Sequence, residues 1–201
     1  MMMRRPSLAA LMLAASLSLA AAEDKAAQPD APAAPTEPQW SEFKSDTQGF
    51  AITFPGAPKV TSAAVDGQNP LVQHDFQVSL GETTVYTVVV FEFPQGRAPK
   101  ADTDYYVKIM NAYAKGSEAR LRRRGPATVA GHSGFEAIAD DGKNKLTHLV
   151  TVVPSGDRIY MLASASPRSR GVDDDAERFR DSFRLLSGEA DNESAASAAG
   201  Q

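Results

Sequence analysis

Apolar residues recur at every second position through much of this chain, and this period restricts the fold more than any other feature of the sequence. In the segment GFAITFP, Phe50, Ile52 and Phe54 alternate with small or polar residues, and Pro55 ends the run. Side chains of a β-strand point alternately to the two faces of a sheet, so a segment with this alternation has one apolar face. The pattern predicts a strand over Gly49–Pro55.

Further segments of this kind lie on both sides of one helical segment. Two precede it and at least four follow it: Leu71–Leu80, Thr83–Phe93, Ala119–Arg124, Gly134–Ala139, Leu146–Val153 and Arg158–Ser164, with another short one at Pro126–Gly131. The β-branched and aromatic residues of Thr83–Phe93 are typical of a central strand. Within GHSGF, Gly131 and Gly134 fit a hairpin turn that needs positive φ.

Two segments have the period of an amphipathic helix instead. The first places four apolar residues on one stripe: Tyr106, Ile109, Met110 and Tyr113. Asp102 or Asp104 is suited to cap its start, and Gly116 fits the position just after its end. The second begins near Asp173–Asp175 and turns four apolar residues inward: Ala176, Phe179, Phe183 and Leu186.

The element order is therefore βββ-α-ββββ-α, with connections of hairpin length between most strands. Short connections favour antiparallel pairing, and amphipathic helices cover the apolar faces of a sheet. We predict an α+β domain with a largely antiparallel sheet of about six to seven strands, covered by two main helices.

The first residues have the three parts of a secretory signal peptide. Arg4 and Arg5 precede an apolar run over residues 8–19, and three alanines at 20–22 supply the small residues that a signal peptidase requires. The run is shorter than the ~20 apolar residues that a membrane span needs. We predict a signal peptide over 1–22 and a periplasmic or secreted product without a transmembrane segment.

Composition divides the remainder of the chain into three parts. Residues 23–39 are rich in Ala, Pro and acidic residues, which predicts a disordered linker, and residues 188–201 form a small, polar, disordered tail. Residues 40–187 form a single domain, and this domain is formally neutral because its basic and acidic side chains are equal in number. A neutral domain argues against nucleic-acid binding. The absence of cysteine excludes disulfides and thiolate sites.

Four segments together resemble the PsbP/DcrB-like family of small exported bacterial proteins: GFAITFPGAPKV, VAGHSGFEA, DRIYMLASAS and AERFRDSFRLL. The resemblance covers nearly all of residues 40–187. It implies an α/β/α sandwich around an antiparallel sheet, a fold shared with an extrinsic photosystem II subunit. Members of the family are mostly accessory envelope proteins without a common catalytic set, so no functional residue is transferred to this chain.

Several patterns resemble catalytic or metal sites but fit them poorly. Ser133 in GHSGF lacks the final glycine of a nucleophile elbow. His74, His132 and His148 are not spaced to share a metal ion, and Asp173–Asp175 lacks the spaced oxygen ligands of a calcium loop. We predict no catalytic residues, no metal site and no cofactor from these patterns.

The segment RLRRRG is the strongest candidate for a binding site. As a regular strand it places Arg120, Arg122 and Arg124 on one face, where three like charges require solvent. One interpretation is a charged edge strand that prevents pairing with other sheets. The other is an arginine strip that binds an anionic partner, joined by Arg168 and Arg170 if the fold brings them near.

These observations favour a non-enzymatic, exported envelope protein that acts by binding a protein, a glycan or another anionic partner. Two alternatives stay open. One is a hydrolase whose site, built around His74 or His148, is assembled only in the fold. The other is a carrier of a small apolar ligand, with a cavity between sheet and helix that the VYTVVVFEF strand helps to line.

Overall fold

The computed structural model describes residues 38–66 and 70–186 of the chain. The predicted signal peptide, most of the predicted linker and the predicted tail lie outside these residues. Within the described ranges, no helix is both long enough and apolar enough to cross a membrane.

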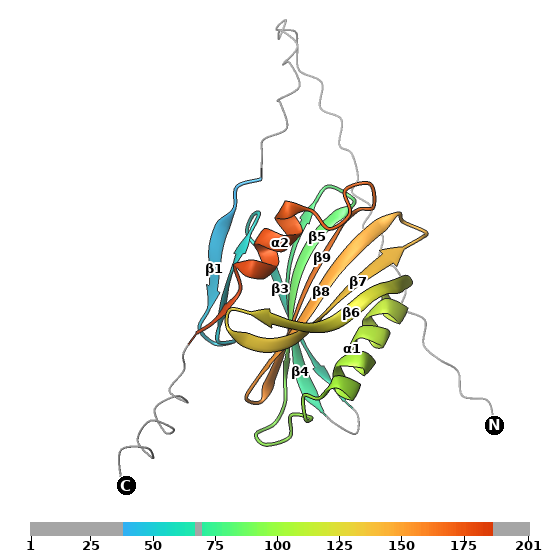
Figure 1. Ribbon diagram of the computed structural model, residues 1–201. Helices are drawn as coiled ribbons and strands as arrows, with labels where there is room; N and C mark the ends of the chain where they lie inside the picture. The colour runs from blue at the N-terminus through green and yellow to red at the C-terminus, as the bar shows by residue number, and fades with distance from the viewer. Residues whose placement is uncertain (1–37, 67–69, 187–201) are drawn as a thin grey trace, which may run out of the picture. The chain divides into compact units, whose positions relative to one another are not determined.

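The described residues form two antiparallel sheets and two helices (Figure 1). In chain order the elements are β1 (Ser41–Ser45), β2 (Phe50–Phe54), β3 (Lys59–Val65), β4 (Leu71–Leu80), β5 (Thr84–Glu92), α1 (Thr103–Gly116), β6 (Ala119–Val129), β7 (His132–Asp141), β8 (Leu146–Ser155), β9 (Arg158–Pro167), α2 (Asp174–Asp181) and β10 (Arg184–Leu185). The large sheet has the order β3-β4-β5-β9-β8-β7-β6, and the small sheet has the order β1-β2-β10.

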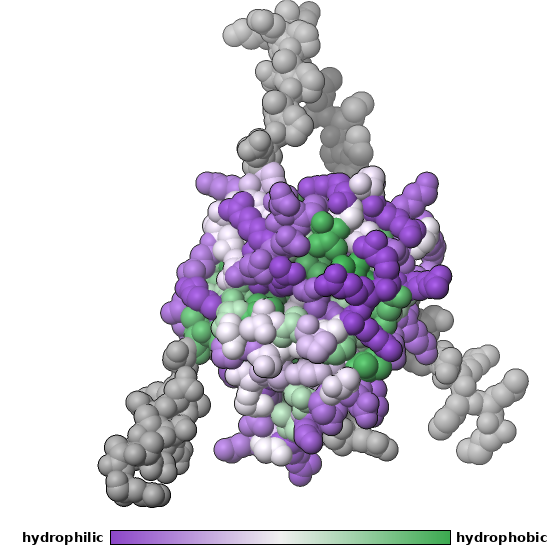
Figure 2. All heavy atoms as spheres, in the orientation of Figure 1, coloured by the Kyte–Doolittle hydropathy of each residue, from purple (hydrophilic) through white to green (hydrophobic). Residues whose placement is uncertain are grey.

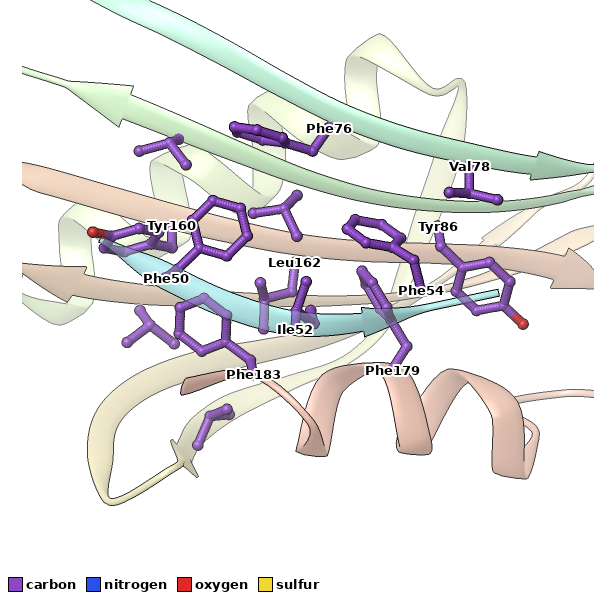
Figure 3. Packing of buried hydrophobic residues seen from close by; sticks show 14 residues of the cluster. Phe50, Ile52, Phe54, Phe76, Val78, Tyr86, Tyr160, Leu162, Phe179 and Phe183 are labelled. Carbon is purple, nitrogen blue, oxygen red and sulfur yellow. The ribbon is translucent and has the colours of Figure 1, made fainter. Parts of the chain in front are cut away.

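One face of the large sheet packs against the small sheet and α2. Rings from β2 meet rings from α2 and the residues after it: Phe54 lies 5.3 Å from Phe179, and Phe50 stacks on Phe183 at 6.1 Å between centroids (Figure 3). All four rings are almost completely buried. Burial of one such side chain contributes about 1.5–3 kcal/mol, so this cluster is a main source of stability.

The opposite face of the large sheet carries α1. Asp102 caps this helix by accepting a hydrogen bond from the backbone N–H of Tyr105 at 3.0 Å. Met110 is completely buried, and Tyr106 stacks on Phe135 of β7 at 5.4 Å. α1 packs mainly on β6 and β7, so it lies over the β6 end of this face.

The α+β prediction is confirmed: the large sheet has seven antiparallel strands, and two helices cover it. The structure also contains strands that the pattern did not predict, namely β1, β3 and β10. All residues of β3 are exposed, so no face of this strand is buried and its sequence has no alternation of apolar and polar residues. β10 is only two residues long and pairs with β2.

Both helices end differently from the prediction. Gly116 is the last residue of α1 rather than the residue after it, and the left-handed conformation falls on Glu118 at φ 53°. α2 ends at Asp181, so Phe183 is buried as predicted but lies beyond the helix. Leu186 is not helical, and its N–H donates to the carbonyl of Gly49 at 2.9 Å.

The hairpin between β6 and β7 uses only one of its two predicted turn glycines. Ala130 and Gly131 form the turn, with φ of 50° and 81°. Gly134 lies inside β7, where a Cβ atom would overlap the carbonyl oxygen of Val152. Glycine is required at position 134 because the backbone of the neighbouring strand β8 lies too close for a Cβ atom, and not because of a turn.

Candidate functional site

Three arginines and one carboxylate line the same hollow at the end of the large sheet where β6 begins and β7 ends. Arg120 lies opposite Asp140 in the β6–β7 pair. The Arg122 Nε atom is 3.7 Å from Asp140 Oδ2, and Arg168 Nη2 is 3.2 Å from the same oxygen. Thr147 Oγ1 donates to the other carboxylate oxygen at 3.2 Å. We call Arg120, Arg122, Arg168 and Asp140 the arginine cluster.

The arginine cluster lines a polar hollow of about 590 Å³, together with backbone and side chains of residues 118–121 and Gly142. The side chains of Arg122 and Arg168 are 55% and 53% exposed, whereas that of Asp140 is 13% exposed. Figure 2 shows hydrophilic residues over much of the visible face, with smaller hydrophobic areas between them. The carboxylate is therefore sheltered while the guanidinium groups face solvent.

The cluster has an excess of positive charge and of hydrogen-bond donors. The Asp140 carboxylate contacts two guanidinium groups, those of Arg122 and Arg168, and Arg120 lines the same hollow. Each guanidinium has five N–H donors. Glu118, which also borders the hollow, pairs with Lys143 at 3.3 Å and so does not neutralise the arginines. Planar guanidinium groups bind carboxylate and phosphate groups with two parallel hydrogen bonds. The arrangement is chemically suited to hold an anion beside Asp140.

The prediction that Arg120, Arg122 and Arg124 share one face is wrong. A β-bulge shifts the register between Leu121 and Arg123, so the alternation reverses along β6. Arg124 therefore lies opposite Ala137, which packs on the α1 face, and donates to Asn111 of α1 at 3.4 Å.

Arg170 also lies outside the cluster. Its guanidinium pairs with Asp173 at 3.0 Å and with Asp175 at 3.6 Å, at the start of α2. Arg168, by contrast, joins Arg120 and Arg122. The fold thus brings together three of the five predicted binding residues. It adds Asp140, although the sequence Asp140-Asp141-Gly142 is typical of a turn between two strands. The one available signal was that Asp140 lies next to the end of β7, the strand that pairs with RLRRRG.

A second polar array crosses four neighbouring strands of the large sheet, β3, β4, β5 and β9. Ser62 Oγ lies 2.7 Å from His74 Nδ1, His74 Nε2 lies 3.2 Å from Glu92 Oε2, and Arg158 Nη2 donates to Glu92 Oε1 at 2.9 Å. Burial opposes ionisation of Glu92, but the hydrogen bonds and charges of Arg158 and His74 outweigh it and hold the pKa of Glu92 below its ordinary value.

The order serine, histidine, carboxylate is that of a hydrolytic triad. However, Ser62 lies on edge strand β3, all of whose residues are exposed. A hydrolase needs hydrogen-bond donors that stabilise the developing oxyanion in a site sheltered from water. β3 provides no such shelter, so the array is better explained as a row of side-chain hydrogen bonds that links β3, β4, β5 and β9.

His148 lies on the opposite face of the sheet from His74. Its Nδ1 is 2.9 Å from the hydroxyl of Tyr113 on α1, and burial lowers its pKa. The two histidines are therefore separated by the sheet and form no joint site. Among residues 38–66 and 70–186, no group of three or more potential ligand side chains is placed to hold a metal ion.

The architecture is that of a PsbP-like α+β sandwich. It is similar to the solution structure of cyanobacterial PsbP from Synechocystis sp. PCC 6803, with a TM-score of 0.54 over 78% of this chain and 98% of that chain, at 15% sequence identity. At this identity the similarity shows the fold alone, and it confirms the resemblance predicted from the sequence. No family model matches the chain. No curated protein matches it either.

Proposed function

We propose that this protein is a non-enzymatic binding protein that holds an anionic group of its partner on the arginine cluster. The observation that carries the proposal is a hollow lined by Arg120, Arg122 and Arg168, in which the guanidinium groups of Arg122 and Arg168 meet on the sheltered carboxylate of Asp140. Charged residues spread over a surface for solubility do not need to converge. Here side chains from β6 and from the β9–α2 connection meet at one hollow.

The partner group is a carboxylate or a phosphate, because these match the planar donors of arginine. We further propose that the partner is a protein or glycan of a bacterial envelope. The sequence supports this through the signal-peptide pattern of residues 1–22, which would deliver the domain to the periplasm or beyond the cell.

Asp140 has a defined part in this proposal. Its carboxylate contacts Arg122 and Arg168 and accepts from Thr147, so it holds the two guanidinium groups side by side. An anion that enters the hollow then meets two guanidinium groups whose orientation is already fixed, instead of two mobile side chains. This saves part of the entropy that ordering long side chains costs on binding.

The test measures binding of the full chain to immobilised polyphosphate and polygalacturonate, which present phosphate and carboxylate groups. The variant Arg122→Ala/Arg168→Ala removes two cluster charges. Arg97→Ala/Lys100→Ala removes two charges from the exposed β5–α1 connection and serves as the matched control. Each exposed ion pair is worth about 0.2–1 kcal/mol, so the loss of two predicts roughly tenfold weaker binding.

The control variant should bind within twofold of the parent. Equal weakening by both variants would show that net charge alone governs binding and would contradict the proposal. Circular dichroism spectra of all three proteins must agree, since the cluster residues are exposed and their removal should leave the fold intact.

A further inference from the structure

A second site lies on the α1 face of the large sheet, away from the arginine cluster. Since α1 packs mainly on β6 and β7, it leaves the neighbouring strands β9, β5 and β4 without a helix above them. Between α1 and these strands runs a groove of about 640 Å³. Its floor includes Phe91 of β5, Phe93 just after β5 and Met161 of β9. Its wall includes Tyr105, Ile109 and Tyr113 of α1.

The lining of the groove is apolar and uncharged. None of the described residues that line it has a formally charged side chain at neutral pH. Burial raises the pKa of Tyr105, and it raises that of Tyr113 to about 12, so both hydroxyls stay neutral.

The polar groups of the lining mostly have partners within the protein. The Gln73 amide donates to Asp75 at 3.0 Å, and the Ser117 hydroxyl donates to the Tyr113 carbonyl at 2.8 Å. The Tyr113 hydroxyl lies 2.9 Å from His148. A charged ligand group inside this groove would lose its water without gaining a partner, which is costly.

The size of the groove and its exposed apolar surface indicate what it holds. Small-molecule sites usually have volumes of about 300–1,000 Å³ and mostly apolar walls. Phe91, Ile109 and Met161 are only partly buried, so apolar surface on both floor and wall faces water. Covering such surface gains about 25 cal/mol for each Å². We propose that this groove binds a small, uncharged, apolar molecule.

The experiment uses N-phenyl-1-naphthylamine, an uncharged fluorescent probe whose emission rises in apolar surroundings. The full chain is titrated with the probe, and stoichiometry and affinity are measured. Ala112→Phe fills the groove, because Ala112 is an exposed lining residue on α1. Lys108→Phe adds the same ring at an exposed position of α1 that does not line the groove, and is the matched control.

Gly116→Leu is a second filling variant. Gly116 lines the end of the groove, and a Cβ atom there meets nothing within 4 Å, so the substitution should fold even if Ala112→Phe does not. We expect saturable binding of one probe per chain, at least tenfold weaker in both filling variants and changed by less than twofold in Lys108→Phe. Arg122→Ala/Arg168→Ala should bind the probe as the parent does. The groove proposal can therefore be refuted without refuting the arginine-cluster proposal, and the reverse also holds.

Three results would overturn the inference. One is the absence of saturable binding to the full chain. Another is equal binding by the parent and both filling variants. The third is a parent dimer, measured by analytical ultracentrifugation, that becomes monomeric when the groove is filled, because a second copy of the chain would then be its occupant.

Discussion

The close approach of β7 to its sheet neighbour β8 can be tested by adding a single methyl group at Gly134. A Cβ atom at this position would overlap the Val152 carbonyl oxygen and touch Val153, so Gly134→Ala must push the two strands apart. The obstacle is backbone in the middle of a sheet, which cannot rotate away as a side chain can. Inserting a methyl group into such a closely packed site costs about 1–3 kcal/mol.

Gly125 in β6 is a close control. It lies in the same hairpin, opposite Glu136, and an added Cβ atom meets nothing within 4 Å. Glycine in a strand is about 0.5–1 kcal/mol less stable than alanine, so Gly125→Ala should be neutral or slightly stabilising. The two variants therefore make the same chemical change, but Gly134→Ala should lower the free energy of unfolding, whereas Gly125→Ala should leave it unchanged or raise it slightly.

The assay is urea-induced unfolding of the full chain, followed by circular dichroism. We expect Gly134→Ala to lower the free energy of unfolding by about 2 kcal/mol, with the slope of the transition unchanged. If Gly134→Ala instead matched the parent within about 0.5 kcal/mol, the close approach of β7 to Val152 would be refuted.

Three further changes probe other parts of the molecule. Phe179→Ala should cost about 3–5 kcal/mol in the same unfolding assay, because this fully buried ring of α2 packs on Phe54. The lowered pKa of Glu92 stabilises the fold above the ordinary carboxyl pKa, and this contribution is lost as the pH falls through the lowered value. Glu92→Gln should therefore lose less stability than the parent between pH 7 and pH 3, and an equal loss would contradict this. Burial raises the pKa of Tyr86 and Tyr113 to about 12, so in an ultraviolet titration Tyr113→Phe should remove part of the late-ionising absorbance.

The elements predicted correctly are those whose burial follows one period. Phe50, Ile52 and Phe54 alternate because one side of β2 faces the core, and Phe179 is buried at a helical spacing from Ala176. β3 has no buried face, so its sequence KVTSAAV shows no alternation. It is a strand because its backbone pairs with β4, and backbone pairing does not require a particular pattern of side chains.

The candidate site was only partly predictable for a related reason. Sequence spacing assigns faces by assuming a regular strand, and a single bulge after Leu121 moves Arg124 to the other face. Arg168 and Arg170 are two positions apart in one connection, yet only Arg168 reaches Asp140, since Arg170 pairs with Asp173, the N-cap residue of α2. Which arginine joins the cluster depends on neighbours that are distant in sequence.

The most direct test of the anion site is a ¹H–¹⁵N nuclear magnetic resonance titration of the full chain with inorganic pyrophosphate. We predict that the largest shifts fall on the backbone amides of residues 118–122, Asp140 and Arg168, and that Arg122→Ala/Arg168→Ala weakens the binding that they report about tenfold. Shifts centred on Arg97 and Lys100, shifts spread evenly over the basic residues, or no saturable shifts at all would contradict a built anion site at the arginine cluster.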